Sequence, residues 1–160
     1  MHPSPAADPC AFDCTLDIAA PAETVYAAFF APDHLAAWWG VRASVTVARP
    51  LGVYALDWPL EPETDAVLGR LGGVFYGVVI DTHPGREFFL ADAYWLPADG
   101  DPIGPMALHV TCEPTAGGTR LRVEQSGCDD SPRWRRFYRM VGARWTQALG
   151  RLKTQLETHG

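Results

Sequence analysis

The sequence predicts an α+β domain in which a curved antiparallel sheet of six to seven strands packs on one long C-terminal helix. Strand-length segments with alternating apolar residues follow one another through short turns rich in Gly and Pro, which favours antiparallel pairing. The last segment changes to apolar residues at three- and four-residue spacing, which is typical of an amphipathic helix. That helix is the only predicted element large enough to cover one face of the sheet.

Length and charge restrict the class of protein. The 160 residues suit one domain, and the 48% hydrophobic content is that of a globular chain. We expect residues 1–11 to form a flexible tail and residues 12–158 to form a single domain. The formal net charge of -6 and the lack of a clustered basic face argue against nucleic-acid binding. No apolar run approaches the ~20 residues that span a bilayer, so we expect no membrane insertion.

The elements can be placed in order. Alternation from Phe12 to Ile18 predicts the first strand. Pro21 and Pro32 each suit the first turn of a short helix, so two short helices follow that strand. Ser131 and Pro132 suit the start of the final helix, which we expect to run for about 26 residues. The other predicted strands lie near 45–47, 54–58, 74–82, 87–95, 106–112 and 119–123, with exposed loops at 59–69 and 97–105.

The four cysteines give no sign of a metal site. Cys10, Cys14, Cys112 and Cys128 form no CxxC pair, and no histidine stands at zinc-ligand spacing from them. We therefore expect reduced cysteines, with Cys14 and Cys112 in the core, and a cytoplasmic location, because no export signal is visible. Motifs for phosphate binding or nucleophilic catalysis are lacking, so we assign no metal, no cofactor and no catalytic residue.

Four segments carry a resemblance to a known superfamily. They are IAAPAETVYAAF at 18–29, PDHLAAWWG at 32–40, GGTRL at 117–121 and GARWTQALGRLK at 142–153. Together they resemble the START-like, or SRPBCC, superfamily, and most of all its AHSA-type branch of heat-shock-ATPase-activator homologues. One departure is that Gly142 and Trp145 are separated here, whereas the family has an adjacent Gly-Trp pair. The resemblance implies the helix-grip fold over residues 12–157, with a pocket between the sheet and the last helix.

The resemblance leaves three functions open, because the superfamily includes lipid carriers, polyketide cyclases and co-chaperones. The first hypothesis is binding of a small apolar or aromatic molecule, without an assigned reaction. The second is a cofactor-independent enzyme of the polyketide cyclase or dehydrase type, which ranks lower because no catalytic motif was found. The third is a co-chaperone-like domain that binds a protein partner, with a homodimer as a further option.

Aromatic residues on the expected inward faces are the main candidates for a binding site, because aromatic walls suit flat, apolar ligands. Asp92 alternates with Leu90 and Tyr94; if that face is inward, Asp92 is a buried acid with a raised pKa. Glu124 and Gln125 are weaker polar candidates. The candidate ligand-binding residues are Trp39, Tyr54, Trp58, Asp92, Tyr94, Phe137, Val141 and Trp145.

Three further expectations concern the pocket and its surroundings. Small residues at Gly77, Ala91 and Gly142 should leave a gap of a few hundred Å³ under the helix. Trp38 and Trp39 point about 100° apart on a helix, so one should be buried and the other should be partly exposed or line the entrance. The basic run Arg133, Arg135, Arg136 and Arg139 should be a solvated helix face.

Overall fold

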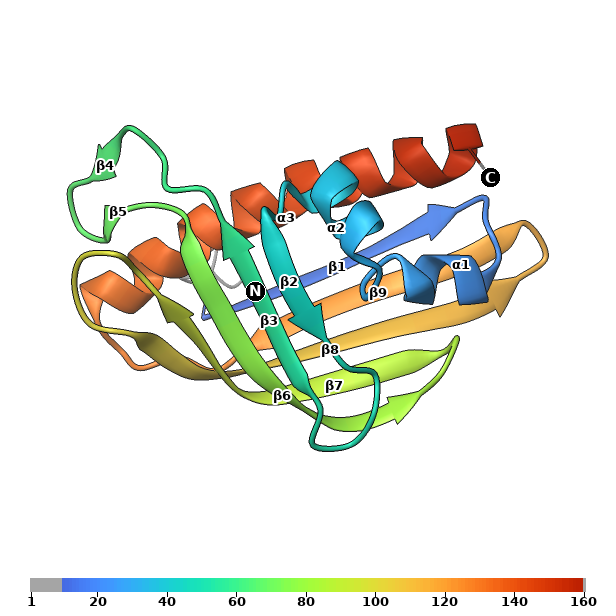
Figure 1. Ribbon diagram of the computed structural model, residues 1–160, viewed down its shortest axis with the longest axis horizontal. Helices are drawn as coiled ribbons and strands as arrows, with labels where there is room; N and C mark the ends of the chain where they lie inside the picture. The colour runs from blue at the N-terminus through green and yellow to red at the C-terminus, as the bar shows by residue number, and fades with distance from the viewer. Residues whose placement is uncertain (1–9, 160) are drawn as a thin grey trace, which may run out of the picture.

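The structure, a computed structural model, describes residues 10–159, so the part of the expected tail at 1–9 lies outside the described residues. Two short helices follow the first strand and a long helix ends the chain, as the sequence predicted (Figure 1). The elements are β1 (Ala11–Ile18), α1 (Ala22–Ala27), α2 (Pro32–Trp39), β2 (Ala43–Thr46), β3 (Val53–Trp58), β4 (Thr64–Asp65), β5 (Gly69–Arg70), β6 (Gly73–His83), β7 (Glu87–Leu96), β8 (Ile103–Thr115), β9 (Gly118–Ser126) and α3 (Pro132–His159).

Seven strands form one antiparallel sheet in the order β1-β9-β8-β7-β6-β3-β2, and β4 and β5 form a separate two-stranded pair. The long helix α3 runs the length of the molecule on one side of this sheet, and α2 lies beside its C-terminal half (Figure 1). The α+β helix-grip architecture predicted from the sequence is therefore confirmed, with seven strands in the main sheet.

The sheet curves because its central strands contain irregularities. The pairing of β6 with β7 shifts between Tyr76 and Val78 and again between Val79 and Asp81. The pairing of β7 with β8 shifts between Leu90 and Ala93. Each inserted residue bends its strand and increases the local twist. A straight helix cannot follow such a surface along its whole length, so side chains or empty space must fill part of the gap.

The two ends of α3 are fixed differently. At the start, Ser131 Oγ accepts a hydrogen bond from the Trp134 N–H at 3.2 Å, ahead of Pro132 in the first turn. At the other end, Lys153 Nζ donates to the carbonyl of Asp17 at 2.6 Å, and Glu157 accepts from the Ala19 N–H at 2.9 Å. These bonds hold the C-terminal half of α3 on β1, where its buried residues are Ala148, Leu149, Leu152 and Leu156.

A disulfide joins Cys10 to Cys128, with the two Cα atoms 5.5 Å apart. The expectation that all four cysteines are reduced was therefore wrong for this pair. Cys10 is covalently anchored and Ala11 already pairs with Ser126, so neither belongs to a loose tail. Disulfides persist mainly in oxidising compartments. The argument for a cytoplasmic location that assumed four reduced cysteines therefore no longer applies. Within residues 10–159, no helix has an apolar stretch long enough to cross a membrane.

The other two cysteines lie in or near the core as expected. Cys112 is buried and Cys14 is half-buried. Burial raises the pKa of the Cys112 thiol to about 12 and also raises that of Cys14. Because the thiolate is the reactive form, both thiols should react slowly in the folded protein.

We predict that two of the four cysteines, Cys14 and Cys112, react with a thiol reagent in denaturant without reductant. All four should react after reduction. Because the bond closes a loop across a separation of 118 residues, Cys128→Ser should lower the free energy of unfolding by about 3–5 kcal/mol. Urea denaturation with Cys14→Ser as the control measures this. Four reactive thiols without reductant would contradict the bond.

Candidate ligand-binding cavity

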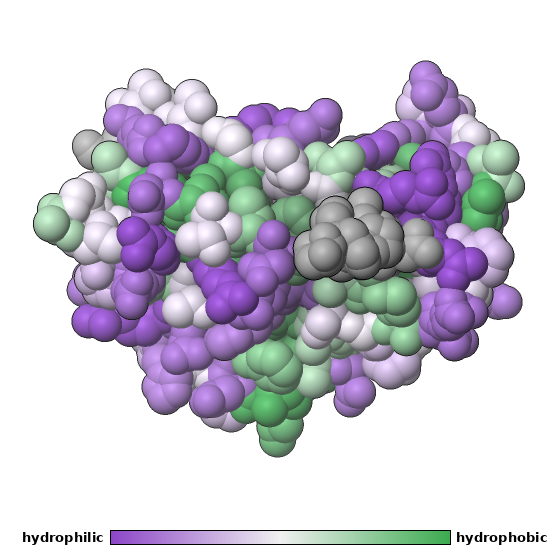
Figure 2. Space-filling view, turned by 180° about the vertical axis from the view of Figure 1, so that it is seen from behind, coloured by the Kyte–Doolittle hydropathy of each residue, from purple (hydrophilic) through white to green (hydrophobic). Residues whose placement is uncertain are grey.

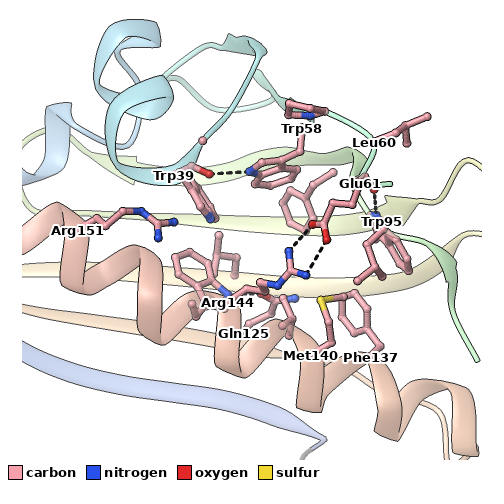
Figure 3. A pocket seen from close by; sticks show the side chains of 18 of the residues that line it. Trp39, Trp58, Leu60, Glu61, Trp95, Gln125, Phe137, Met140, Arg144 and Arg151 are labelled. Atoms are coloured by element: carbon pink, nitrogen blue, oxygen red, sulfur yellow. Dashed lines mark hydrogen bonds and ion pairs between the residues drawn. The ribbon is translucent and has the colours of Figure 1, made fainter. Parts of the chain in front are cut away.

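A cavity of about 470 Å³ lies between the sheet and α3 (Figure 3). Its volume is within the range of small-molecule sites and matches the few hundred Å³ expected from the sequence. Most of its lining is aromatic or aliphatic and comes from the sheet, from α3 and from the end of α2. These lining side chains are Trp39, Trp58, Leu71, Phe75, Trp95, Leu108, Phe137, Met140, Val141 and Trp145.

The end of α2 supplies one wall. Gly40, at a φ of 71°, ends the helix in the left-handed conformation that glycine adopts readily. Trp38 is fully buried and its indole N–H donates to the Ala28 carbonyl at 2.9 Å. Trp39 is half-buried and lines the cavity, with its ring centroid 4.6 Å from that of Trp145. The expectation that the two adjacent tryptophans differ in environment is confirmed.

The other tryptophans of the cavity are fixed by hydrogen bonds from their indole N–H groups. The indole N–H groups of Trp58 and Trp95 donate to backbone carbonyls, those of Trp39 and Gly72, both at 2.8 Å. The Trp145 N–H donates to Gln125 Oε1, also at 2.8 Å. Since these N–H groups are satisfied by the protein, the rings can form the wall of an apolar space without an unpaired donor.

Five of the candidate residues predicted from the sequence line this cavity: Trp39, Trp58, Phe137, Val141 and Trp145. Tyr54 also points inward but lies outside the cavity. Its hydroxyl donates to the Phe29 carbonyl at 2.6 Å, and its ring lies 5.6 Å from that of Phe88. Tyr54 therefore packs under the α1–α2 segment rather than under α3, and burial raises the pKa of its hydroxyl above the ordinary value.

Asp92 and Tyr94 do not share the inward face of Leu90, and that expectation was wrong. Between the pairs Leu90 with Leu108 and Ala93 with Met106, β7 advances by one residue more than β8. Asp92 lies in this bulge with a φ of 49° and is exposed. The extra residue reverses the alternation, so Trp95 points inward and Tyr94 points to the outer face.

Small residues do not create the cavity in the way we expected. A Cβ atom added at Gly142 would meet Phe12 Cδ1 at 3.5 Å, so this glycine faces β1 rather than the cavity. Ala91 pairs with Val78 on the outer face of the sheet. Neither residue lines the cavity. The gap follows instead from the curvature of β6 and β7 beneath a straight helix.

Residues 59–72, which we call the flap, close one side of the cavity with Leu60, Leu71 and the Pro59 and Pro62 rings. The sequence suggested an exposed loop over most of this segment, but it contains β4 and β5 and the buried residue Leu68. Figure 3 shows an ion pair between Glu61 of the flap and Arg144 of α3, at distances of 2.5 and 3.0 Å. Hydrogen bonding to Arg144 lowers the pKa of Glu61.

A second ion pair fastens the flap to α3 farther along. The Asp65 side chain is only 6% exposed and accepts hydrogen bonds from Arg136 Nε at 2.9 Å and Nη2 at 2.5 Å. It also accepts from the backbone N–H groups of Val67 and Leu68. These bonds, the one from Arg136 above all, lower the pKa of Asp65 to about 2. Arg136 is thus part of a tertiary contact and not of the solvated face that we expected.

Several lining residues were not candidates from the sequence. Trp95 was missed because the bulge at Asp92 reverses the strand alternation, and the flap was missed because its ion pairs join residues far apart in the chain. Arg151 lies at the rim, where its Nε donates to the Trp38 carbonyl at 3.0 Å. Among residues 10–159, no three His, Cys, Asp or Glu side chains are placed to hold a metal ion.

Asp65 should make stability depend on pH. Its pKa is about 2 in the folded protein, below the ordinary 3.8, so its contribution is present above about pH 4 and is lost as the pH falls towards 2. Asp65→Asn should therefore lower the free energy of unfolding by about 1–3 kcal/mol at pH 7 and by less at pH 3.

Urea denaturation of the variant and the wild type at pH 7, 4 and 3 measures this difference. The matched control is Asp92→Asn, because Asp92 is exposed and makes no ion pair in the described part of the chain. An Asp65→Asn effect that is the same at all three pH values would contradict the assignment.

Comparison with known proteins places this chain in a family. Among solved structures, protein MLL2253 from Mesorhizobium loti has a TM-score of 0.70 at 23% identity, covering 94% of this chain and 98% of that chain. The Aha1 dimer from Colwellia psychrerythraea has a TM-score of 0.65 at 16% identity, covering 92% and 96%. DynU16, a putative protein in the dynemicin biosynthetic locus, has a TM-score of 0.67 at 19% identity, covering 94% of this chain and 48% of that chain.

These structural likenesses, all at low identity, establish the fold alone. Among curated proteins, none matches this chain. A family model does match, over residues 19–157, which is most of the chain. The protein belongs to the family of activator of Hsp90 ATPase homolog 1-like proteins, the AHSA-type branch of the START-like superfamily.

Proposed function

We propose that the protein binds one small, largely apolar molecule with an aromatic ring system in the cavity under α3. The observation that carries this proposal is that rings from three parts of the fold face one space of about 470 Å³. Trp39 comes from α2, Trp58 and Trp95 come from the sheet, and Phe137 and Trp145 come from α3. Walls of this kind suit a flat apolar ligand and bury most of its surface.

Binding ranks above catalysis because of where the ionisable groups of the lining lie. Glu61, Arg144 and Arg151 are partly exposed and stand at the rim. The pKa of Glu61 is lowered by its bond with Arg144, so this carboxylate is unsuited to donate a proton near neutral pH. A cyclase or dehydrase would need an acid or base beside the bound molecule. The cofactor-independent enzyme therefore remains the lower-ranked alternative.

The proposal predicts saturable binding of a polarity-sensitive aromatic dye. 1-Aminoanthracene should bind at one site with micromolar affinity, about -8 kcal/mol, and its fluorescence should rise on leaving water. Val141→Trp should weaken this binding at least tenfold, because the larger side chain fills the cavity. The matched control is Arg139→Trp, which adds the same ring to an exposed position of α3.

Fluorescence titration measures the affinities, and urea denaturation checks that both variants fold. Absence of saturable binding to the wild type would contradict the proposal. Equal affinity of the wild type and Val141→Trp would place the dye elsewhere and would contradict it as well.

A second candidate function is self-association, which a feature of the outer sheet face favours. Directly paired residues share a face, so Val45, Ala55, Tyr76 and Tyr94 form a row across β2, β3, β6 and β7. Tyr76 is 42% exposed and Ile80, on the same strand and face, is 45% exposed. Figure 2 shows from the opposite side that the turn between β2 and β3 ends in a hydrophobic tip.

The opposite half of the outer face is charged instead. On β1 and β9, Arg122 pairs with Asp13 at 2.8 Å and Arg120 pairs with Asp17 at 3.3 Å. An apolar half beside a charged half is typical of a surface that binds another protein. We propose that a second copy of this chain covers the apolar half, since the Aha1 structure from Colwellia psychrerythraea is described as a dimer.

If this face forms the dimer interface, Tyr76→Glu should raise the dimer dissociation constant at least tenfold, because it would bury a charge in the interface without a partner. Ser126→Glu, exposed on β9, is the matched control and should leave the dissociation constant unchanged. Sedimentation velocity over a range of concentrations measures it. A wild type that is monomeric at every concentration would contradict the dimer and would favour another protein as the partner of this face.

A further inference from the structure

Gln125 is the one amide side chain in the lining of the cavity, and it is only 2% exposed. It extends from β9, on the inward face that it shares with Val123, and reaches the cavity below Arg144 (Figure 3). A buried amide carries two N–H donors and one carbonyl acceptor, and each of them needs a partner. The partners of Gln125 therefore indicate which hydrogen-bonding group a ligand in the cavity would need.

The orientation of this amide is determined by its neighbour. The indole of Trp145 is a donor only, and its N–H lies 2.8 Å from Gln125 Oε1. Turning the amide round would bring two donors together, so the oxygen must face Trp145. The NH₂ group consequently points away from Trp145.

The NH₂ group has only a weak partner in the described chain. Gln125 Nε2 donates to the thioether sulfur of Met106 at 3.3 Å, and a thioether is a poor acceptor. The second N–H has no acceptor among residues 10–159. The indole donors of three other lining residues, Trp58, Trp95 and Trp145, are already satisfied by the protein.

The remaining indole donor of the lining belongs to Trp39, and it lies towards Arg151 at the rim (Figure 3). Gln125 is thus the inner donor that is free to bind a ligand. A molecule that fills the cavity and excludes water must offer an acceptor at this position, or else it leaves a buried N–H unpaired.

We infer that the cavity selects planar aromatic molecules that carry a carbonyl oxygen, such as aromatic ketones and quinones, over hydrocarbons of the same shape, and that Gln125 Nε2 is the group that recognises the oxygen. This inference rests on the proposed function, because it names the class of molecule for the same cavity. The aromatic walls bind the ring system, and the amide fixes its orientation. Selectivity arises because a site built around a hydrogen-bond donor disfavours an analogue without the acceptor.

The test compares 9-fluorenone with fluorene, which share a rigid tricyclic skeleton and differ by one carbonyl oxygen. Each competes with 1-aminoanthracene for the wild-type protein. The ketone should bind about tenfold more tightly than the hydrocarbon, the ratio expected for one neutral hydrogen bond. Gln125→Leu should bring the two affinities within about twofold, mainly by weakening the ketone.

Two further variants separate recognition from folding. Gln125→Glu keeps an oxygen for the Trp145 N–H but replaces the NH₂ group with an acceptor, so it should also lose the preference for the ketone. Met106→Leu removes the sulfur but leaves the amide, so it should keep the preference. Thermal unfolding identifies any variant that fails to fold. If one of the two Gln125 variants does not fold, the other is enough to test the role of this residue.

The outcomes distinguish this inference from the proposed function. Equal binding of ketone and hydrocarbon to the wild type overturns the inference and leaves ligand binding intact. Binding of the dye without competition by either compound also overturns the inference. A tenfold preference that persists in a folded Gln125 variant overturns the assignment to this residue. Failure of the dye and of both compounds to bind overturns the proposed function and the inference together.

Discussion

The architecture depends on the packing of one straight helix against a sheet that curves away from it. Leu149, Leu152 and Leu156 bring the C-terminal half of α3 into direct contact with β1 and α2. Bulges in β6 and β7 curve the rest of the sheet, so the N-terminal half of the helix cannot make the same contact. Large rings, the flap and a remaining cavity occupy the space between them.

Electrostatic contacts complete the enclosure where packing alone does not. Glu61 and Asp65 both lie in the flap. Asp65 pairs with Arg136 and Glu61 pairs with Arg144, and both arginines belong to α3. Asp65 is nearly covered and accepts four N–H bonds, whereas the Glu61 pair is partly exposed. Because exposed ion pairs contribute little and covered, well-satisfied ones contribute more, the Asp65 end should be the firmer attachment. The Glu61 end, which borders the cavity, is the weaker one.

The sequence sufficed to predict the fold and five of the residues that line the cavity. Alternation along strands and helical spacing identified Trp58, Phe137, Val141 and Trp145, because these residues lie in regular elements where periodicity decides the face. Asp92 and Tyr94 were misplaced because one inserted residue in β7 reverses the alternation, and nothing in the local pattern marks it.

Long-range contacts were the other source of error. The flap looked like an exposed loop because its charges are partnered by arginines more than seventy positions away. The Cys10–Cys128 bond was missed because the sequence shows no export signal, which favoured reduced cysteines. Gln125 was noted only as a weak candidate, and its role depends on Trp145, which the fold alone brings to its side.

The disulfide also divides the chain in a way that the secondary structure does not. Residues 10–128 form a covalently closed ring that contains every strand of the main sheet, and α3 is the one helix that follows the ring. No covalent bond other than the continuous chain joins α3 to the sheet within the described residues. The position of α3 over the cavity therefore depends on packing, hydrogen bonds and ion pairs, whereas the start of β1 and the end of β9 are also joined covalently.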